Sequence, residues 1–150
     1  MTDVHVVETD EGYEDALSVR YSVFVDEQGV DPDLEVDDHE EESTHFVAYE
    51  AGDPVGVARL REYEHVPTVE REKPTAKIER MAVLRNYRGR GLGRTILEAV
   101  EETARKQGFE RARLHAQIRS AGFYEALGYE RVSEEFEEAG IPHVAMEKRL

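Results

Sequence analysis

Residues 81–94 of the chain read MAVLRNYRGRGLGR, an apolar run followed by a glycine-rich turn and the start of a helical pattern. Glycines let a backbone approach an anion closely, and the free N–H groups of a helix N-terminus point at it with the positive end of the helix dipole behind them. Three arginines, Arg88, Arg90 and Arg94, add guanidinium donors at the same place. The stretch therefore predicts a phosphate-binding turn, with a tight turn carrying incidental arginines as the alternative.

The spacing of the turn excludes two well-known phosphate motifs. A P-loop needs Gly-Lys followed by Ser or Thr, and the turn has neither the lysine nor the hydroxyl in place. A dinucleotide-binding fold places Gly-x-Gly-x-x-Gly on a first strand–helix unit, with an acidic residue about 20 positions further on. Here the pattern is Arg88-x-x-Gly91-x-Gly93, in the middle of the chain.

Periodic patterns continue on both sides of the turn. Strands are expected at 3–8, 45–50, 54–62, 76–84, 111–118, 129–136 and 143–148. Helices are expected at 11–27, from Leu92 to a stop at Gly108, and at 121–127. Polar loops are expected at 29–43 and from 63 to Pro74. The resulting order, β-α-β-β-β-α-β-α-β-β, predicts a mixed α/β fold in a single domain over residues 1–150.

Length and composition narrow the function classes. A chain of 150 residues is long enough to bury a core of its own. No apolar run approaches the ~20 residues that span a bilayer, and the first residues do not resemble a signal peptide, so we expect a cytoplasmic protein with no membrane partner. The absence of cysteine excludes disulfides, thiolate zinc sites and thiol nucleophiles.

The charge is strongly negative. Asp and Glu total 34 against 19 Lys and Arg, which gives a formal net charge of −15. A field of this sign repels nucleic acid, so we expect no nucleic-acid partner. An acidic, lysine-poor surface is typical of halophilic proteins, whose self-repulsion is screened by concentrated salt. An acidic interaction surface is the alternative.

With these residues in view, the turn resembles the acetyl-CoA pyrophosphate loop of the GNAT superfamily of N-acetyltransferases. Four further segments resemble the ElaA-like subgroup: RYSVFVDEQ at 20–28, AQ at 116–117, FYEALGY at 123–129 and GIPH at 140–143. The resemblance implies a mostly antiparallel central sheet, flanked by helices and splayed between its fourth and fifth strands to admit the pantetheine arm. It also implies acetyl-CoA as co-substrate, no metal and, by analogy, a homodimer.

The resemblance carries cofactor contacts over to this sequence residue by residue. The backbone of Met81–Val83 would pair with the pantetheine amides, Arg88–Arg94 would cradle the pyrophosphate, Gln117 takes the place of the family's usual Asn, and Phe123 lies beside the thiol. The implied contacts are Met81, Ala82, Val83, Arg88, Gly89, Arg90, Gly91, Leu92, Gly93, Arg94, Gln117 and Phe123.

Acetyl transfer to an amine needs an acid and a route for the ammonium proton, whose pKa is ~10.4 in a lysine-like amine. Tyr124 matches the family's acid, which protonates the departing thiolate, and a core tyrosine bonded to backbone is the alternative. The candidate bases are Glu79, on the strand leading into the turn, and His143 or His45, which begin strands. Deprotonation through water, with no dedicated base, also stays open.

The acidic segment 31–42 spaces its side chains like a calcium loop. However, Val36 stands where an EF-hand needs glycine, and Pro32 follows the first ligand position, so we expect no metal there. A wall that attracts a cationic substrate is an intermediate interpretation. We therefore predict an acetyl-CoA-dependent N-acetyltransferase acting on a primary amine of a small molecule or peptide by direct attack in a ternary complex. A non-catalytic acyl-CoA-binding regulatory module is the alternative.

Overall fold

The computed structural model describes residues 2–35, 37, 39–63 and 75–150. One sheet runs through the described part of the chain in the order β1-β2-β3-β4-β5-β8-β6, with β7 paired to β8. The strands are β1 (Thr2–Val6), β2 (Thr44–Glu50), β3 (Asp53–Glu62), β4 (Thr75–Val83), β5 (Arg111–Gln117), β6 (Glu130–Arg131), β7 (Phe136–Glu138) and β8 (Ile141–Arg149). The helices are α1 (Asp10–Arg20), the π-helix η1 (Tyr21–Glu27), α2 (Pro32–Glu35), the 3-10 turns η2 (Arg85–Tyr87) and η3 (Ile118–Ser120), α3 (Leu92–Lys106) and α4 (Ala121–Ala126).

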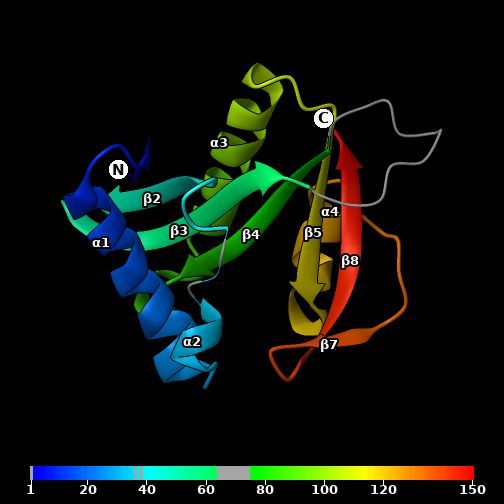
Figure 1. Cartoon of the computed structure of the whole chain (residues 1–150), viewed down its shortest axis with the longest axis horizontal. Helices are drawn as coiled ribbons and strands as arrows, with labels where there is room; N and C mark the ends of the chain where they lie inside the picture. Colours follow the sequence, from blue (N-terminus) through cyan, green and yellow to red (C-terminus); the bar gives the residue numbers. More distant parts are fainter. Residues whose placement is uncertain (1, 36, 38, 64–74) are drawn as a thin grey trace.

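The pairing of β4 with β5 is the one parallel pairing among the described strands. It extends only from Thr75 opposite Arg111 to Ile78 opposite Leu114. Beyond that point the strands diverge, as Figure 1 shows, so their carboxyl ends open a V in the middle of the sheet. The predicted mixed sheet, splayed between its fourth and fifth strands, is therefore confirmed.

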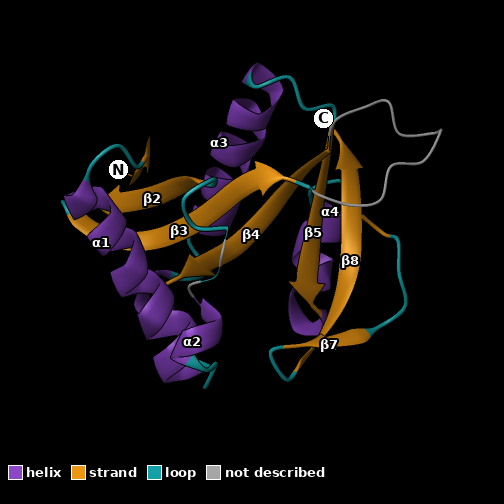
Figure 2. Cartoon of the chain, viewed as in Figure 1, coloured by secondary structure: helices purple, strands orange, loops and turns teal. Residues whose placement is uncertain are grey.

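Helices cover both faces of the sheet (Figure 2). The apolar residues that recur every three or four positions along α3 pack with α4 and the strands into the larger core, which contains Ile96, Leu97 and Val100. Glycine at position 56 brings α3 close to β3, because a Cβ there would lie 2.5 Å from Cδ1 of Ile96. A second core forms where Val19 and Val23, from α1 and η1, meet the opposite face. No helix of the described residues is long and apolar enough to cross a membrane.

A bulge bends β4 beside the V. Arg59 of β3 pairs with Glu79 of β4 and Val57 pairs with Ala82, so two β4 residues stand opposite one β3 residue. Arg80 lies in this bulge with φ +55°, a left-handed conformation that is uncommon for a residue with a side chain. The bulge turns the end of β4 away from β5 and reorients the side chains that face the opening.

Three sequence expectations need correction. The helix expected at 11–27 is α-helical only to Arg20 and continues as a π-helix, because the period of a short apolar run does not distinguish the two. The strand expected at 129–136 is instead two short strands, β6 and β7, on different stretches of β8. The loop expected at 29–43 contains α2. Most of the second polar loop, residues 64–74, lies outside the described residues.

Candidate active site

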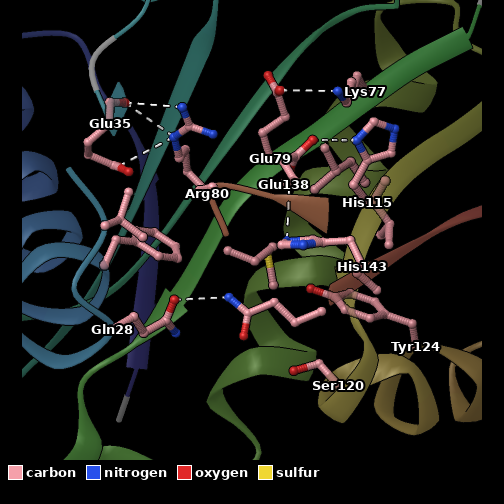
Figure 3. Close-up of a pocket in the computed structure, with 18 of the residues that line it drawn as sticks. Gln28, Glu35, Lys77, Glu79, Arg80, His115, Ser120, Tyr124, Glu138 and His143 are labelled. Carbon is pink, nitrogen blue, oxygen red and sulfur yellow. Dashed lines mark hydrogen bonds and ion pairs between the residues drawn. The ribbon is translucent and has the colours of Figure 1, made fainter. Parts of the chain in front are cut away.

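A cavity of about 350 Å³ occupies the opening between β4 and β5. Its wall reaches from η1 and α2 on one side of the sheet to α4 on the other, and the β7–β8 turn closes one end. Figure 3 shows the polar side chains that point into it. The charged, polar and titratable residues of its lining are Gln28, Glu35, Asp37, Lys77, Glu79, Arg80, His115, Gln117, Ser120, Tyr124, Glu138 and His143.

The glycine turn presents free backbone donors beside this opening. Gly89 and Gly91 have φ +81° and +82°, the left-handed region that favours glycine, and Gly91 is the N-cap of α3. The first helical hydrogen bond runs from the N–H of Thr95 to the carbonyl of Gly91. The N–H groups of residues 89–94 make no hydrogen bond to any described residue. Six successive unpaired donors at a helix N-terminus fit a pyrophosphate.

The arginines of the turn contact carboxylates of the protein itself. Arg88 donates to both carboxylate oxygens of Glu27 at 2.8 Å and to the carbonyl of Val83 at 2.9 Å. Arg94 donates to Glu98 at 2.8 Å. Arg90, the third, lies 5.3 Å from the ring centroid of Tyr87 and 3.5 Å from a carboxylate oxygen of Glu50. In this structure each arginine of the turn therefore contacts a carboxylate of the protein, and Arg88 ties the turn to η1.

Side chains connect the turn to the cavity. A Cβ on Gly93 would lie 3.2 Å from the ring of Phe123, so the two helices touch there. The rings of Phe123 and Tyr124 are 5.0 Å apart, and Tyr124 lines the cavity. On the β4 side, Met81 lines the cavity, while Ala82 is paired to β3. Across the V, Gln117 Nε2 donates to Gln28 Oε1 at 2.9 Å, which links β5 to the end of η1.

Tyr124 is buried, with 8% of its surface exposed. Burial raises the pKa of its hydroxyl well above the ordinary value, and this hydroxyl makes no hydrogen bond within the described part of the chain. The backbone-bonded core tyrosine of the alternative interpretation is therefore not what the structure contains. The hydroxyl keeps its proton at neutral pH and faces the cavity, as an acid would.

Glu79 sits in a dense set of cations. Its carboxylate accepts from Arg59 and Arg61 at 2.7 Å each and lies 3.4 Å from Lys77 Nζ. Burial alone would raise the pKa of Glu79, but the hydrogen bond from Arg61 and the charges of Arg59 and Lys77 lower it to about 2. A carboxylate with so low a proton affinity is poorly suited to deprotonate an ammonium group.

His143 lies on the opposite wall, on β8. Its Nδ1 is 2.6 Å from the carbonyl of Ile141, and its Nε2 is 3.8 Å from Oε2 of Glu138. The other oxygen of Glu138 accepts from Nδ1 of His115 at 2.8 Å. Burial opposes ionisation of Glu138, but the hydrogen bond from His115 and the charges of His115, His143 and Lys77 lower its pKa below the ordinary value. The cluster thus presents one ionised carboxylate between two imidazoles.

His45 does not line the cavity. It is buried on β2, and its Nε2 is 2.9 Å from the carbonyl of Glu40. Burial lowers the pKa of His45 despite that bond and the charge of Glu40. This is the environment of a strand-end histidine satisfied by backbone.

The acidic segment 31–42 folds inward. Arg20, which is 1% exposed, donates to Glu35 at 2.6 Å and to Glu40 at 2.7 and 3.0 Å. Arg59, which is fully buried, donates to Glu40 at 2.6 Å. Three acids of the segment, Glu35, Asp37 and Glu40, are thus partners of buried arginines rather than a solvated wall, and the described residues contain no cluster of three groups that could hold a metal ion.

Sequence reasoning missed several cavity residues. His115 could have been found, since Ala112, Leu114 and Ala116 alternate with it on β5 and are buried on the other face. Glu138 and Arg80 gave no such signal, because one lies beside a hairpin turn and the other in a bulge.

The comparisons with known proteins agree with this geometry. The chain matches the acetyltransferase (GNAT) domain family over residues 7–150. It is 38% identical over 144 residues to the uncharacterized N-acetyltransferase YjcF of Bacillus subtilis, which covers 95% of this chain and 96% of the relative.

Solved structures share the fold. The structure of Escherichia coli ElaA superposes with a TM-score of 0.81 at 23% identity, covering 99% of each chain. A GNAT family acetyltransferase from Elizabethkingia anophelis, solved with acetyl-CoA bound, superposes with a TM-score of 0.67 at 15% identity over 99% of this chain and 98% of that one. The splayed sheet, the glycine turn and the family match together show that this chain belongs to the GNAT acetyltransferase family.

Proposed function

We propose that the protein transfers an acetyl group from acetyl-CoA to a primary amine of a small molecule or peptide, by direct attack while both substrates are bound. The observation that carries the proposal is the run of six backbone N–H groups at residues 89–94 that bond to no described residue, next to the opening between β4 and β5. When bound, acetyl-CoA supplies a thioester whose carbonyl carbon is open to attack by an amine.

The chain's own residues divide the task by position. Backbone N–H groups of the turn would hold the pyrophosphate, and the edge of Met81–Val83, which lies beyond the pairing of β4 with β5, would hold the pantetheine amides. Gln117, at the end of β5, lines the same opening, and Phe123, on α4, lies against Gly93 of the turn. Arg88 keeps the turn against η1 through Glu27, so its part is to position those amides.

Tyr124 donates the proton that the departing sulfur needs. Its buried hydroxyl has a raised pKa and is therefore protonated at neutral pH, and because it has no partner among the described residues it can hydrogen-bond to a group that enters the cavity. Donation in the transition state lowers the barrier, whereas the same hydroxyl adds little to ground-state binding.

The glycine turn gives the sharpest test of cofactor binding. Gly91→Val forces a β-branched side chain into a left-handed position, which costs ~1–3 kcal/mol, so the turn should rearrange and the affinity for acetyl-CoA should fall about 10²-fold in calorimetry. Gly52→Val is the matched control. Gly52 has φ +86° in the β2–β3 turn and, like Gly91, has nothing within 4 Å of the place that a Cβ would take, so both variants should lose similar stability.

We expect the Gly52 variant to bind acetyl-CoA as the wild type does. Equal affinities in the two variants would contradict the assignment of the turn. Release of free thiol from acetyl-CoA over a panel of primary amines and peptide N-termini then identifies the acceptor. Binding without thiol release in any of them would instead favour the non-catalytic acyl-CoA-binding module.

A further inference from the structure

The β7–β8 hairpin brings an acid and a base together at one end of the cavity. Its two turn residues, Ala139 and Gly140, both have positive φ, +53° and +76°, as in a type I′ turn. This turn pairs Glu138 with Ile141 and leaves Glu138 and His143 lining the same cavity (Figure 3). The hairpin therefore fixes the spacing between this carboxylate and this imidazole.

The tautomer of His143 follows from its contacts. A backbone carbonyl can only accept a hydrogen bond, so Nδ1, 2.6 Å from the carbonyl of Ile141, must carry the proton of the neutral ring. The lone pair is then on Nε2. The ring is held against Phe136, with the two ring planes 24° apart, so Nε2 keeps its direction toward Glu138.

Two acceptors consequently face one another without a proton between them. His143 Nε2 and Glu138 Oε2 are 3.8 Å apart, beyond hydrogen-bond distance, while Oε1 of Glu138 is already bonded to His115. A group with several N–H donors satisfies both acceptors at once, and a protonated primary amine is such a group.

Glu138 also differs from the other carboxylates of the cavity. Glu35, Asp37 and Glu79 each pair with arginine, whereas Glu138 forms no ion pair with an arginine or lysine among the described residues. Its negative charge is left for an incoming cation, and Lys77 and Arg80, on the β4 wall, are occupied by other carboxylates.

We propose that the Glu138–His143 pair binds the ammonium group of the acceptor and that His143 is the general base, an inference that rests on the proposed acetyl transfer. One nitrogen proton passes to Nε2 of His143, and the freed lone pair forms the new N–C bond as the C–S bond of the thioester breaks. A second nitrogen proton replaces the one that Tyr124 gives to the sulfur, and His143 returns its own proton to solvent. Glu138 stabilises the imidazolium in between.

A variant that keeps the hydrogen bond to the carbonyl of Ile141 distinguishes a catalytic role of His143 from a structural one. His143→Asn retains an N–H donor near the position of Nδ1 but has no atom at Nε2, so the hairpin should stay folded. We expect kcat/KM for the amine to fall by ~10²–10⁴-fold and its acidic limb to disappear from the pH profile. The other titratable groups that face His143 across the cavity, and that can therefore influence this pH profile, are Glu138 on β7, His115 on β5, Lys77 and Glu79 on β4, and Tyr124 on α4.

Two variants complete the set. Glu138→Gln keeps the size of the side chain but not its charge, and it should raise KM for the amine about 10-fold and move the acidic limb to lower pH. His45→Gln is the matched control, since its amide can reach the carbonyl of Glu40 as Nε2 does, outside the cavity. It should leave kcat/KM within about twofold of the wild type.

A measurement on the free protein tests the inference without turnover. Long-range ¹H–¹⁵N spectra of the histidine rings, assigned by difference with His143→Asn, should show His143 as the Nδ1–H tautomer when neutral. An Nε2–H tautomer would overturn the inference whatever the activity. If the wild-type protein acetylates amines and His143→Asn does so with undiminished kcat/KM, the inference is also overturned, while the proposed function stands.

Discussion

The glycine turn before α3 presents backbone amides from six successive residues, whereas the cavity wall presents charged side chains from segments far apart in the sequence. On the turn side, the side chains of the arginines are exposed, and Arg94 and its partner Glu98 are each more than 60% exposed. On the cavity side, the side chain of Arg59 is fully buried and that of Glu79 is only 11% exposed. The difference matters because a backbone cradle is set by local conformation, while the buried charges depend on the whole fold.

The largest effect should come from breaking the buried charges. Arg59 is fully buried and donates to Asp37 and Glu40, and it also donates to Glu79. Arg59→Met fills much of the same volume but leaves three carboxylates facing one another. The free energy of unfolding, measured by denaturant titration, should fall by about 3–5 kcal/mol.

Arg94→Met is the counterpart on the turn side. Its i,i+4 pair with Glu98 is exposed, so its loss should change stability by less than about 0.5 kcal/mol. Equal losses in the two variants would show that the two regions do not differ in the way the contacts indicate. A clear loss of acetyl-CoA affinity in Arg94→Met would indicate that the Arg94 side chain contacts the pyrophosphate directly.

A smaller effect, the pH dependence of the free energy of unfolding, should also differ between the two regions. The pKa of Glu79 is lowered to about 2, so its charged form stabilises the folded state above the ordinary glutamate range near 4.5. That contribution is lost as pH falls from about 4.5 toward 2. The stability difference between wild type and Glu79→Gln should therefore shrink by about 2 kcal/mol over this window.

The exposed Glu98 supplies the control for this pH dependence. Glu98→Gln should change stability little at any pH in the window, since its pair with Arg94 lies at the surface. A difference between wild type and Glu79→Gln that stays constant from pH 5 to pH 2 would mean that Glu79 titrates as it does in the unfolded chain.

The same contrast explains what could be predicted from the sequence. The turn, the start of α3 and the splay follow from local patterns, from glycine conformation, and from a resemblance carried by contiguous motifs. The partners of the buried arginines lie 15 and 20 residues from Arg20 and 22 and 19 residues from Arg59, so no local pattern connects them. The acidic composition of segment 31–42 favours a solvent-exposed loop, and no local pattern indicates that Glu35 and Glu40 point into the protein.

The position of the base could be predicted only as a set of alternatives. Glu79, His45 and His143 all lie at strand positions that could face a cleft, and the pleat alone does not distinguish them. The structure separates them by neighbours: arginines surround Glu79, a backbone carbonyl lies at Nε2 of His45, and a carboxylate oxygen of Glu138 lies 3.8 Å from Nε2 of His143. Such contacts depend on the bulge at Arg80, which leaves no pattern in the sequence, and on the β7–β8 turn, where Gly140 indicates a turn but not which side chains it brings together.

The most direct test of acetyl transfer at this cavity compares two neighbouring tyrosines whose rings are 5.8 Å apart. Tyr124→Phe should lower kcat by ~10²–10⁴-fold, with acetyl-CoA affinity and melting temperature close to wild type, because its hydroxyl has no partner among the described residues. Tyr129→Phe should do the opposite, since its hydroxyl donates to buried Glu101 at 2.7 Å: kcat within about twofold and a stability loss of ~1–3 kcal/mol. An unchanged kcat in Tyr124→Phe, under conditions where the chemical step limits turnover, would contradict the account.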